Sequence, residues 1–321
     1  MNNIWQKLKK ENEPFFVLAP MEDVTDTVFR QMVIKLSPPD LMVTEFVNAD
    51  GYCSPGREAV GRRLRYTKKE QPLIAQIWGL NPVNYRQMAK DLVGMGFAGI
   101  DINMGCPVKD VVKKGACSAM ILNHELAALV ISETRAGILD AGGDIPLSVK
   151  TRIGYNEPDV TSWIGFLLKQ NLDAITVHGR TRKQMSKVPA DWQEIAKAVK
   201  LRDKLSPQTV IVGNGDVMSR AQGESLAKMS GVDGVMIGRG IFHDPFIFSK
   251  TAKKADLKLM LKYLKQHIEL HQKTWGGEKF EPLKKFIKMY ISGFAGSSEI
   301  RAKLFAAKSH VDLIKMIDNI V

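Results

Sequence analysis

Eight short apolar runs, rich in β-branched residues, recur along the first 240 residues and alternate with segments of helical periodicity. The runs occupy residues 15–21, 41–47, 72–79, 99–105, 146–152, 174–180, 209–216 and 234–240. Strands that are covered on both faces are nearly continuous in apolar residues, and strand–helix alternation is typical of parallel sheets. Eight repeats therefore predict an α/β fold, a closed (β/α)8 TIM barrel.

An open, doubly wound sheet is the alternative architecture for the same alternation. That fold needs a glycine-rich turn after its first strand, and residues 19–26, APMEDVTD, contain no glycine. The expected helices also carry start signals, such as Asn81 in a capping position followed by Pro82. The barrel is the architecture that we expect.

After residue 245 the strand pattern stops. Residues 257–275 and 283–294 instead place apolar residues three and four apart with lysines between them, which predicts helices. The turn at residues 275–277 and the segment 292–300 are expected to separate these helices. The sequence thus predicts a catalytic barrel over residues 1–245 and a small all-α helical domain over residues 246–321.

The formal net charge is +12, and most of it lies near the C-terminus. Residues 250–321 hold fifteen Lys and Arg against seven Asp and Glu, an excess of eight positive charges. A basic surface of this kind favours a polyanionic partner such as RNA.

Cysteine content and hydropathy indicate the compartment. Cys53, Cys106 and Cys117 have no CxxC spacing, which predicts free thiols rather than a disulfide framework or a metal site. No apolar run approaches the roughly 20 residues that cross a bilayer, and the N-terminus lacks the apolar stretch of a signal peptide. We expect a cytoplasmic protein without membrane contact.

Parallel barrels place their chemistry at the C-terminal ends of the strands. The fourth run ends with Asn103 and Cys106, and the loop that follows carries Lys109, Lys113 and Lys114. A cysteine can be a small core residue, but this position favours a reactive group. The basic loop is long enough to close over a bound substrate.

Four further strand ends carry polar groups. Lys150 and Arg152 end the fifth run, and His178 and Arg180 end the sixth, so that several cations converge on one mouth and indicate an anion or an electron-rich ring. Residues 213–216 and 238–240 form two glycine-rich turns that suit a phosphate. A lone basic residue at a strand end is usually solvated surface, and a single glycine-rich turn is weak evidence because turns need glycine in any case. The convergence of the basic residues and the pairing of the two turns support the site.

Gln76 on the third run and Asn103 on the fourth carry amides that both donate and accept hydrogen bonds. Such groups suit the edge of a flavin or a uracil ring. Buried structural amides are the alternative interpretation.

These stretches resemble the tRNA-dihydrouridine synthase family. The matching segments run in family order: APMEDVTDTVFR (19–30), PLIAQIWG (72–79), DINMGCP (101–107), SVKTRIG (148–154), TVHGRTR (176–182), ADW (190–192), IVGNGDV (211–217), GVMIGRG (234–240) and EIRAKL (299–304). Members of that family are similar in having an FMN-binding barrel followed by a helical domain that helps hold tRNA.

The resemblance implies roles for individual residues. Cys106 is expected to be the general acid, since a thiol with an unperturbed pKa keeps its proton at neutral pH. Lys150 is expected to stabilise a reduced flavin. The implied cofactor-binding residues are Pro20, Met21, Glu22, Gln76, Lys150, His178, Asn214, Gly215, Asp216, Gly238 and Arg239. The implied substrate-binding residues are Asn103, Lys109, Lys113, Lys114, Arg152, Arg180 and Arg301, and no metal is implied.

The implied reaction is reduction of the C5–C6 bond of uridine in tRNA. NADPH would reduce FMN, flavin N5 would deliver hydride to C6 and Cys106 would protonate C5 of a uridine turned out of its stack. Two alternatives remain: a flavin barrel that reduces a small enone or pyrimidine, and a non-enzymatic RNA-binding protein. The basic C-terminal region argues against the first, and the polar strand ends argue against the second. No obligatory protein partner is evident.

Two segments depart from the family pattern. Cys117 stands where the family usually has glycine, so that turn is expected to be less tight. Residues 185–189, MSKVP, stand where an aromatic residue with glycine often precedes ADW.

Overall fold

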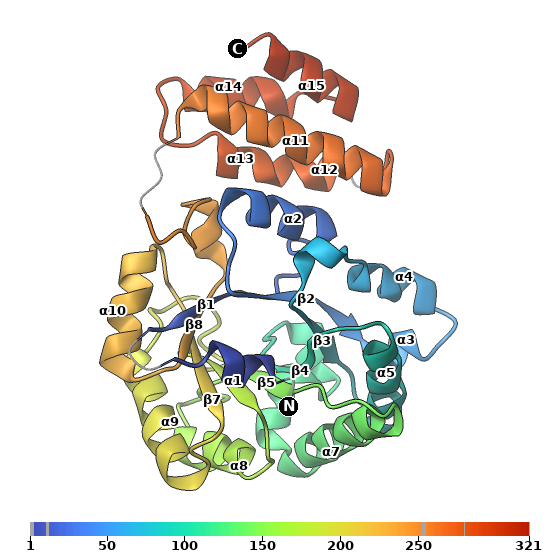
Figure 1. The fold of residues 1–321 in the computed structure, drawn as a ribbon, viewed down its shortest axis with the longest axis vertical. Coiled ribbons are helices and arrows are strands. Elements are labelled where there is room, and N and C mark those ends of the chain that lie inside the picture. The colour runs from blue at the N-terminus through green and yellow to red at the C-terminus, as the bar shows by residue number, and fades with distance from the viewer. Residues whose placement is uncertain (1–2, 11–12, 252–254, 279, 321) are drawn as a thin grey trace.

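The structure, a computed structural model, describes residues 3–10, 13–251, 255–278 and 280–320. Its eight parallel strands close into a barrel in sequence order, as predicted (Figure 1). The strands are β1 (Phe15–Leu18), β2 (Leu41–Asn48), β3 (Leu73–Trp78), β4 (Gly99–Met104), β5 (Leu147–Arg152), β6 (Ala174–His178), β7 (Val210–Asn214) and β8 (Gly234–Ile237).

Helices surround the barrel on its outer face. They are α2 (Thr27–Leu36), α3 (Ala49–Tyr52), α4 (Arg57–Gly61), η1 (Arg62–Leu64), η2 (Lys68–Glu70), α5 (Pro82–Gly94), α6 (Lys109–Lys113), η3 (Cys117–Leu122), α7 (His124–Asp140), η4 (Val160–Ile164), α8 (Gly165–Leu168), α9 (Trp192–Leu205), α10 (Arg220–Ser230) and η5 (Arg239–Phe242). The Asn81 side chain accepts a hydrogen bond from the Val83 amide at 3.1 Å and caps α5, which confirms the predicted start signal.

The strands alternate between two apolar clusters, because successive side chains point to opposite faces. Val17, Ile74 and Val212 belong to the cluster inside the barrel. Trp5, on the short helix α1 (Ile4–Leu8), joins that cluster and packs on Phe15 with ring centroids 6.1 Å apart. Helix α1 therefore closes the N-terminal end of the barrel, and the chemistry is left to the opposite end.

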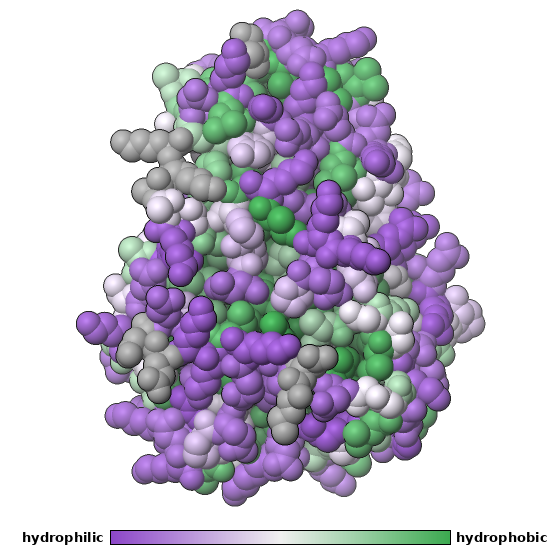
Figure 2. All heavy atoms as spheres, viewed as in Figure 1, coloured by the Kyte–Doolittle hydropathy of each residue, from purple (hydrophilic) through white to green (hydrophobic). Residues whose placement is uncertain are grey.

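The N-terminal end of the barrel faces the viewer in Figures 1 and 2. Hydrophilic residues cover most of this face of the molecule in Figure 2. A cavity of about 1170 Å³ opens here beside Lys9, Lys10 and Arg220. Several of its charges are paired within the chain, for example Lys9 with Asp233 at 3.3 Å.

The C-terminal region is helical, as predicted. It contains α11 (Leu257–Trp275), α12 (Phe280–Leu283), η6 (Lys284–Phe286), α13 (Ile287–Tyr290), α14 (Ser297–Phe305) and α15 (His310–Asp318). Helix α11 ends at Gly276, whose φ of 62° confirms the predicted turn. The helix predicted over 283–294 is instead broken into short pieces, and α14 begins inside the segment predicted to be a connection. The division of the chain at residue 245 stays a prediction.

The helical region packs against α2 of the barrel (Figure 1). Phe29 on α2 stacks on Phe286 with ring centroids 5.1 Å apart, and Phe242 stacks on both rings. The indole Nε1 of Trp275 donates to Asp26 at 2.9 Å, while the other carboxylate oxygen of Asp26 caps α2 through the Phe29 amide. One aspartate thus holds both the start of α2 and the end of α11.

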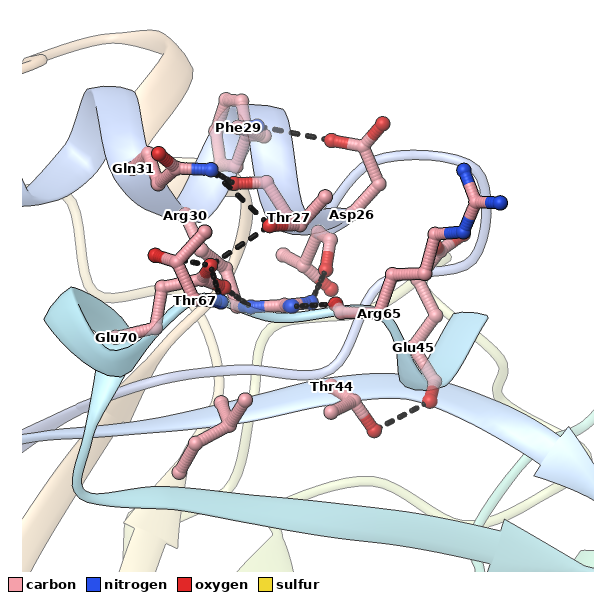
Figure 3. Close-up of polar contacts among 12 residues, drawn as sticks. Asp26, Thr27, Phe29, Arg30, Gln31, Thr44, Glu45, Arg65, Thr67 and Glu70 are labelled. Carbon is pink, nitrogen blue, oxygen red and sulfur yellow. Dashed lines mark hydrogen bonds and ion pairs between the residues drawn. The ribbon is translucent and has the colours of Figure 1, made fainter. Parts of the chain in front are cut away.

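A buried ion pair ties α2 to η2, the segment before β3 (Figure 3). Arg30 and Glu70 are both fully buried, and Arg30 Nε donates to Glu70 at 2.7 Å. The remaining guanidinium donors reach the carbonyls of Thr25 at 2.6 Å and Arg65 at 2.8 Å. Thr27 donates to the same carboxylate at 2.7 Å. Because every charge has partners, this network can exist in a dry interior.

Within the described ranges, no single helix is both long and apolar enough to span a bilayer; the segments Lys109–Leu122 and His124–Asp140 reach that threshold only as a pair, and they are bent by 91°.

Candidate active site

A pocket of about 180 Å³ opens at the C-terminal ends of β1, β5, β6, β7 and β8. Small-molecule sites usually exceed about 300 Å³, so this volume suits one end of an elongated ligand. Nine of the eleven predicted cofactor residues line it, together with Arg180: Pro20, Met21, Lys150, His178, Asn214, Gly215, Asp216, Gly238 and Arg239. The remaining two, Glu22 and Gln76, are not among its lining residues.

Lys150 and Asn214 face each other inside the barrel. Lys150 Nζ donates to Asn214 Oδ1 at 3.1 Å, and Asn214 Nδ2 donates to the Met236 carbonyl at 2.8 Å. Burial lowers the pKa of Lys150 to about 8, helped by repulsion from Arg152 and opposed by attraction to Asp101. Lys150 is therefore a cation at neutral pH that can release its proton in mildly alkaline solution.

A chain of amides and hydroxyls lies beneath the mouth, across β3, β4 and β5. Asn103 donates to Gln76 at 3.1 Å, and Gln76 donates to Asp101 at 2.6 Å. Ser148 donates to the other oxygen of Asp101 at 2.6 Å. Burial raises the pKa of Asp101 to about 6, against the opposing effect of these two hydrogen bonds and of Lys150. Gln76 thus has both ends of its amide engaged within the chain.

His178 lies in a ring of positive charge. Burial holds its pKa well below the usual value, and the charges of Lys150, Arg152 and Arg180 add to that effect. Arg180 donates to His178 Nε2 at 3.1 Å, which suits a neutral imidazole. The ring is therefore an uncharged polar group at the pocket wall near pH 7.

Asp216 organises the turn after β7. It pairs with Arg180 and, at 3.3 Å, with Arg239, and it accepts from the Ala190 amide at 2.9 Å. Burial alone would raise its pKa, but the hydrogen bonds from Arg180 and Ala190 hold the pKa below its usual value. Asp216 therefore stays ionised and positions two arginines, and its predicted contact with a cofactor remains a prediction.

Close backbone approach explains the ADW motif. An added Cβ on Gly213 would lie 2.4 Å from the Trp192 ring, so glycine is required there. The Trp192 indole donates to the Gly215 carbonyl at 3.0 Å, and Asp191 caps α9. Gly215 itself has a φ of 133°, a conformation open mainly to glycine. The motif thus fixes the turn that lines the pocket.

The two arginines predicted to bind substrate, Arg152 and Arg180, are buried and donate to backbone carbonyls. Arg152 reaches Gly105 at 2.7 Å and Met185 at 2.9 Å. Arg180 reaches Val188 at 2.6 Å. Both therefore anchor residues 185–189, the segment that departs from the family pattern, and their contact with substrate remains a prediction.

Cys106 follows β4 at the mouth and is partly exposed. Its amide donates to Asn103 Oδ1 at 3.0 Å. Its thiol accepts a hydrogen bond from Cys117, which lowers the pKa of Cys106 to about 7 although burial opposes this, and Val108 and Arg152 add to the lowering. The thiol is therefore more acidic than an unperturbed cysteine, and it is a readier proton donor.

Cys117 has a φ of 53°, in the left-handed region that favours glycine. The expected loosening of this turn stays a prediction. The side chain is fully buried, and burial together with the neighbouring Cys106 raises its pKa well above the usual value.

The remaining predicted contacts are spread over the surface. Lys109, Lys113 and Lys114 are exposed on and just after α6. Arg301 lies on α14 and donates to the Ile291 carbonyl at 2.8 Å, within the helical region. The structure thus places the three lysines on the loop after Cys106, and it places Arg301 in the helical region.

Three carboxylates meet beside the pocket where no metal site was predicted. The ligand atoms of Glu22, Asp23 and Glu45 lie within 4.8 Å of one another. Arg63 pairs with Glu22 at 2.5 Å, and burial followed by repulsion from Asp26 and Glu22 raises the pKa of Glu45 to about 7. The charge of Arg63 and the protonation of Glu45 thus reduce the negative charge of this carboxylate cluster.

Sequence reasoning missed Asp101, Ser148 and Cys117. The first two could have been found, because alternation along β4 and β5 puts them on the same interior face as Asn103 and Lys150. Cys117 could not, because its contact depends on the path of a loop.

Comparison with known proteins gives a consistent answer. The family described as dihydrouridine synthase (Dus) matches residues 17–320. The chain is 43% identical over 321 residues to "Probable tRNA-dihydrouridine synthase 2" of Bacillus subtilis (strain 168), covering 99% of this chain and 96% of that protein. It is also 43% identical to "Probable tRNA-dihydrouridine synthase" of Staphylococcus aureus (strain MRSA252), covering 98% and 95% of the two chains.

Solved structures share the fold at low sequence identity. DHODH from Eimeria tenella in complex with ferulenol gives a TM-score of 0.52 at 13% identity, over 73% of this chain and 78% of that one. Morphinone reductase gives 0.51 at 10% identity, over 73% and 84%. These solved structures show a shared fold only. The family match and the relatives at 43% identity extend over nearly the whole chain. The chain belongs to the dihydrouridine synthase family.

Proposed function

We propose that this protein is a tRNA-dihydrouridine synthase that uses FMN and NADPH to reduce the C5–C6 double bond of uridines in tRNA. The observation that carries the proposal is the joining, at one barrel mouth, of a cationic pocket around Lys150, Asn214 and Arg239 with an acidic thiol at Cys106. Membership of the family and the names of its relatives support the substrate.

The donor set fits a phosphorylated flavin. Arg239 is exposed at the pocket wall, beside the glycine-rich turns, where a phosphate dianion would find a cation. Lys150 lies deeper, with its ammonium held by Asn214, and suits the electron-rich pyrimidine edge of the ring. The neutral His178 completes a polar wall. When bound, the flavin supplies the hydride.

The chain itself handles the proton. Cys106 is the residue that we assign to protonation of uracil C5, with Asn103 holding the Cys106 amide and Cys117 donating to the thiol. The amide oxygen of Asn103 accepts a hydrogen bond from the Gly105 amide, and its amide nitrogen donates one to Gln76. Asn103 therefore fixes the position of Cys106, and its second amide N–H is the group that we assign to uracil.

A small enone or pyrimidine is the alternative substrate, and RNA binding without catalysis is the alternative function. Nucleoside mass spectrometry of tRNA from cells with and without the gene separates these options, since the proposal requires dihydrouridine to be lost in the deletion strain. Unchanged dihydrouridine at every tRNA position would reject the proposal. Complementation with the intact gene is the control.

Arg239→Ala is expected to weaken flavin binding by about tenfold to a hundredfold, because a hydrogen bond to a charged group contributes about 1.5–3 kcal/mol. The side chain is 59% exposed, so its removal should leave the fold intact. Flavin released per mole of purified protein and the dissociation constant for added FMN measure the effect. Arg86→Ala, on the α5 surface beside Asp140, is the matched control. Equal flavin affinity in both variants would place the phosphate elsewhere.

Lys285 and Lys288 are expected to contact RNA phosphates from the side of the helical region next to the β1–α2 loop. Both are exposed, and Lys285 donates to the Asp23 carbonyl of that loop. Changing both to alanine should reduce the slope of log affinity against log salt by roughly 0.7–0.9 for each RNA phosphate that a lysine no longer neutralises. Filter binding of tRNA at several salt concentrations measures the slope. Lys204→Ala with Lys228→Ala, at the opposite end of the barrel, should leave it unchanged.

A further inference from the structure

The loop after β4 folds back so that two cysteines of this chain meet. The Cys106 carbonyl accepts hydrogen bonds from the Ser118 amide at 3.4 Å and from the Ser118 hydroxyl at 2.8 Å. These bonds bring Cys117, the residue before Ser118, beside Cys106, where each thiol shifts the pKa of the other. Ten residues lie between the two cysteines in sequence, a span that a short loop can close.

The two thiols differ in exposure. Cys106 is partly open to the barrel mouth, whereas Cys117 is fully buried behind it. The pKa of Cys106 is lowered to about 7 by the hydrogen bond from Cys117, so much of it is thiolate at neutral pH. An accessible, acidic cysteine beside a second thiol is the arrangement in which oxidation is site-selective.

Cys53 provides a reference thiol within the same chain. It is exposed at the end of α3 and donates to the Asn84 carbonyl at 3.6 Å. Burial raises its pKa, and Asp91 adds to that effect. Cys53 is therefore more open to solvent than Cys106 but less nucleophilic.

We propose that Cys106 and Cys117 form an oxidation site for hydroperoxides, which closes to an intramolecular disulfide. The Cys106 thiolate attacks one peroxide oxygen, so that an S–O bond forms, the O–O bond breaks and hydroxide leaves. The Cys117 sulfur then attacks the sulfenic sulfur, so that the S–S bond forms, the S–O bond breaks and water leaves. Two thiols lose two electrons, and one hydrogen peroxide becomes two waters.

The disulfide would remove the proton that Cys106 holds. This loss of activity rests on the proposed function, whereas formation of the disulfide does not. Because Cys117 is held beside Cys106 by the Ser118 hydrogen bonds, its attack on the sulfenic acid is intramolecular and can precede that of a second peroxide or an outside thiol. Thiol reductants restore the pair by exchange, so the device would be reversible.

The test exposes the purified full-length protein to hydrogen peroxide at neutral pH and identifies linked peptides by mass spectrometry. Wild type should form a Cys106–Cys117 linkage with loss of two hydrogens, reversed by dithiothreitol, while Cys53 stays reduced. Cys117→Ser, which preserves size and a side-chain donor, should instead accumulate a Cys106 sulfenic acid that dimedone traps. Cys117→Gly, which suits the left-handed backbone, should accumulate the same species more slowly, because the donor that lowers the pKa of Cys106 is missing. A stable Cys106 sulfenic acid in wild type, or preferential oxidation of Cys53, would overturn the proposal.

Activity is followed in parallel, with each protein normalised to its own value before oxidation. Dihydrouridine formation by wild type should fall at least tenfold as the disulfide forms, and it should return with dithiothreitol. If the disulfide forms and uridine reduction continues, the result supports the oxidation site and contradicts the role of Cys106 as proton donor. If no disulfide forms, the oxidation site falls and the proposed function is untouched.

Discussion

Cys106→Ala is expected to reduce uridine in tRNA about two to four orders of magnitude more slowly than wild type, the usual contribution of a positioned general acid. Flavin binding and its reduction by NADPH should be nearly unchanged, because neither step uses the thiol proton and Cys106 does not line the pocket that we propose for the flavin. Anaerobic stopped-flow measurement separates the steps. The reduced flavin of the variant should be reoxidised slowly by tRNA but normally by oxygen.

The pH dependence of that reoxidation supplies the control. Because the pKa of Cys106 lies near 7, its protonated form predominates below this pH and disappears above it. The wild-type rate with tRNA should therefore be level in acid and fall about tenfold per pH unit above roughly pH 8. Cys106→Ser, whose hydroxyl does not titrate here, should lack the fall that begins near pH 7 and keep only a fall above about pH 8 from Lys150. A variant that lost its flavin, or reacted at the wild-type rate, would make Cys106 a packing residue.

Arg30→Met is expected to lower the free energy of unfolding by about 3–5 kcal/mol, since it leaves the Glu70 carboxylate buried without its cation. Urea denaturation followed by tryptophan fluorescence measures the change. Adding Glu70→Leu should recover part of the loss, because the unpaired charge is then removed. The network in Figure 3 also loses its bonds to the Thr25 and Arg65 carbonyls in either variant.

The matched control is an ion pair at the surface. Arg62 and Glu278 lie 3.1 Å apart with side chains 42% and 66% exposed, so Arg62→Ala should change the free energy of unfolding by less than about 1 kcal/mol. Similar decreases in the free energy of unfolding for Arg30→Met and Arg62→Ala would contradict the view that burial makes the loss of Arg30 costly.

The barrel could be predicted because its signals are local. Each strand is marked by its own apolar run, and parallel barrels join such strands in sequence order. The broken helix around residue 284 could not be predicted in this way. Leu283 and Phe286 are three residues apart, a spacing that fits one turn of either a 3₁₀-helix or an α-helix, and the structure has η6 there. Apolar spacing alone does not distinguish these two backbones.

The residues that line the pocket could be predicted from the alternation of side chains along the strands. The contacts that support those residues could not. Arg152, His178 and Asn214 are register partners on neighbouring strands. Lys150 lies two residues before Arg152 on the same interior face, so their meeting is a consequence of register and alternation. The charge of Arg152 and Arg180 was visible in the sequence, but the loop carbonyls that they bind were not, because those carbonyls belong to residues 181–188 folded back over the strand ends. Long-range loop paths carry no periodic signal.

Helix α2 connects the helical region to the pocket. At its start, Asp26 holds the helix and the end of α11 together, and along its length Phe29 supports the ring of Phe286. The loop between β1 and α2 contains Met21, which lies at the pocket wall. Because Asp26 and Phe29 join the helical region to α2, a shift of the helical region would also displace the start of α2 and the loop that carries Met21. We therefore expect the orientation of the helical region and the shape of the pocket wall at Met21 to be coupled.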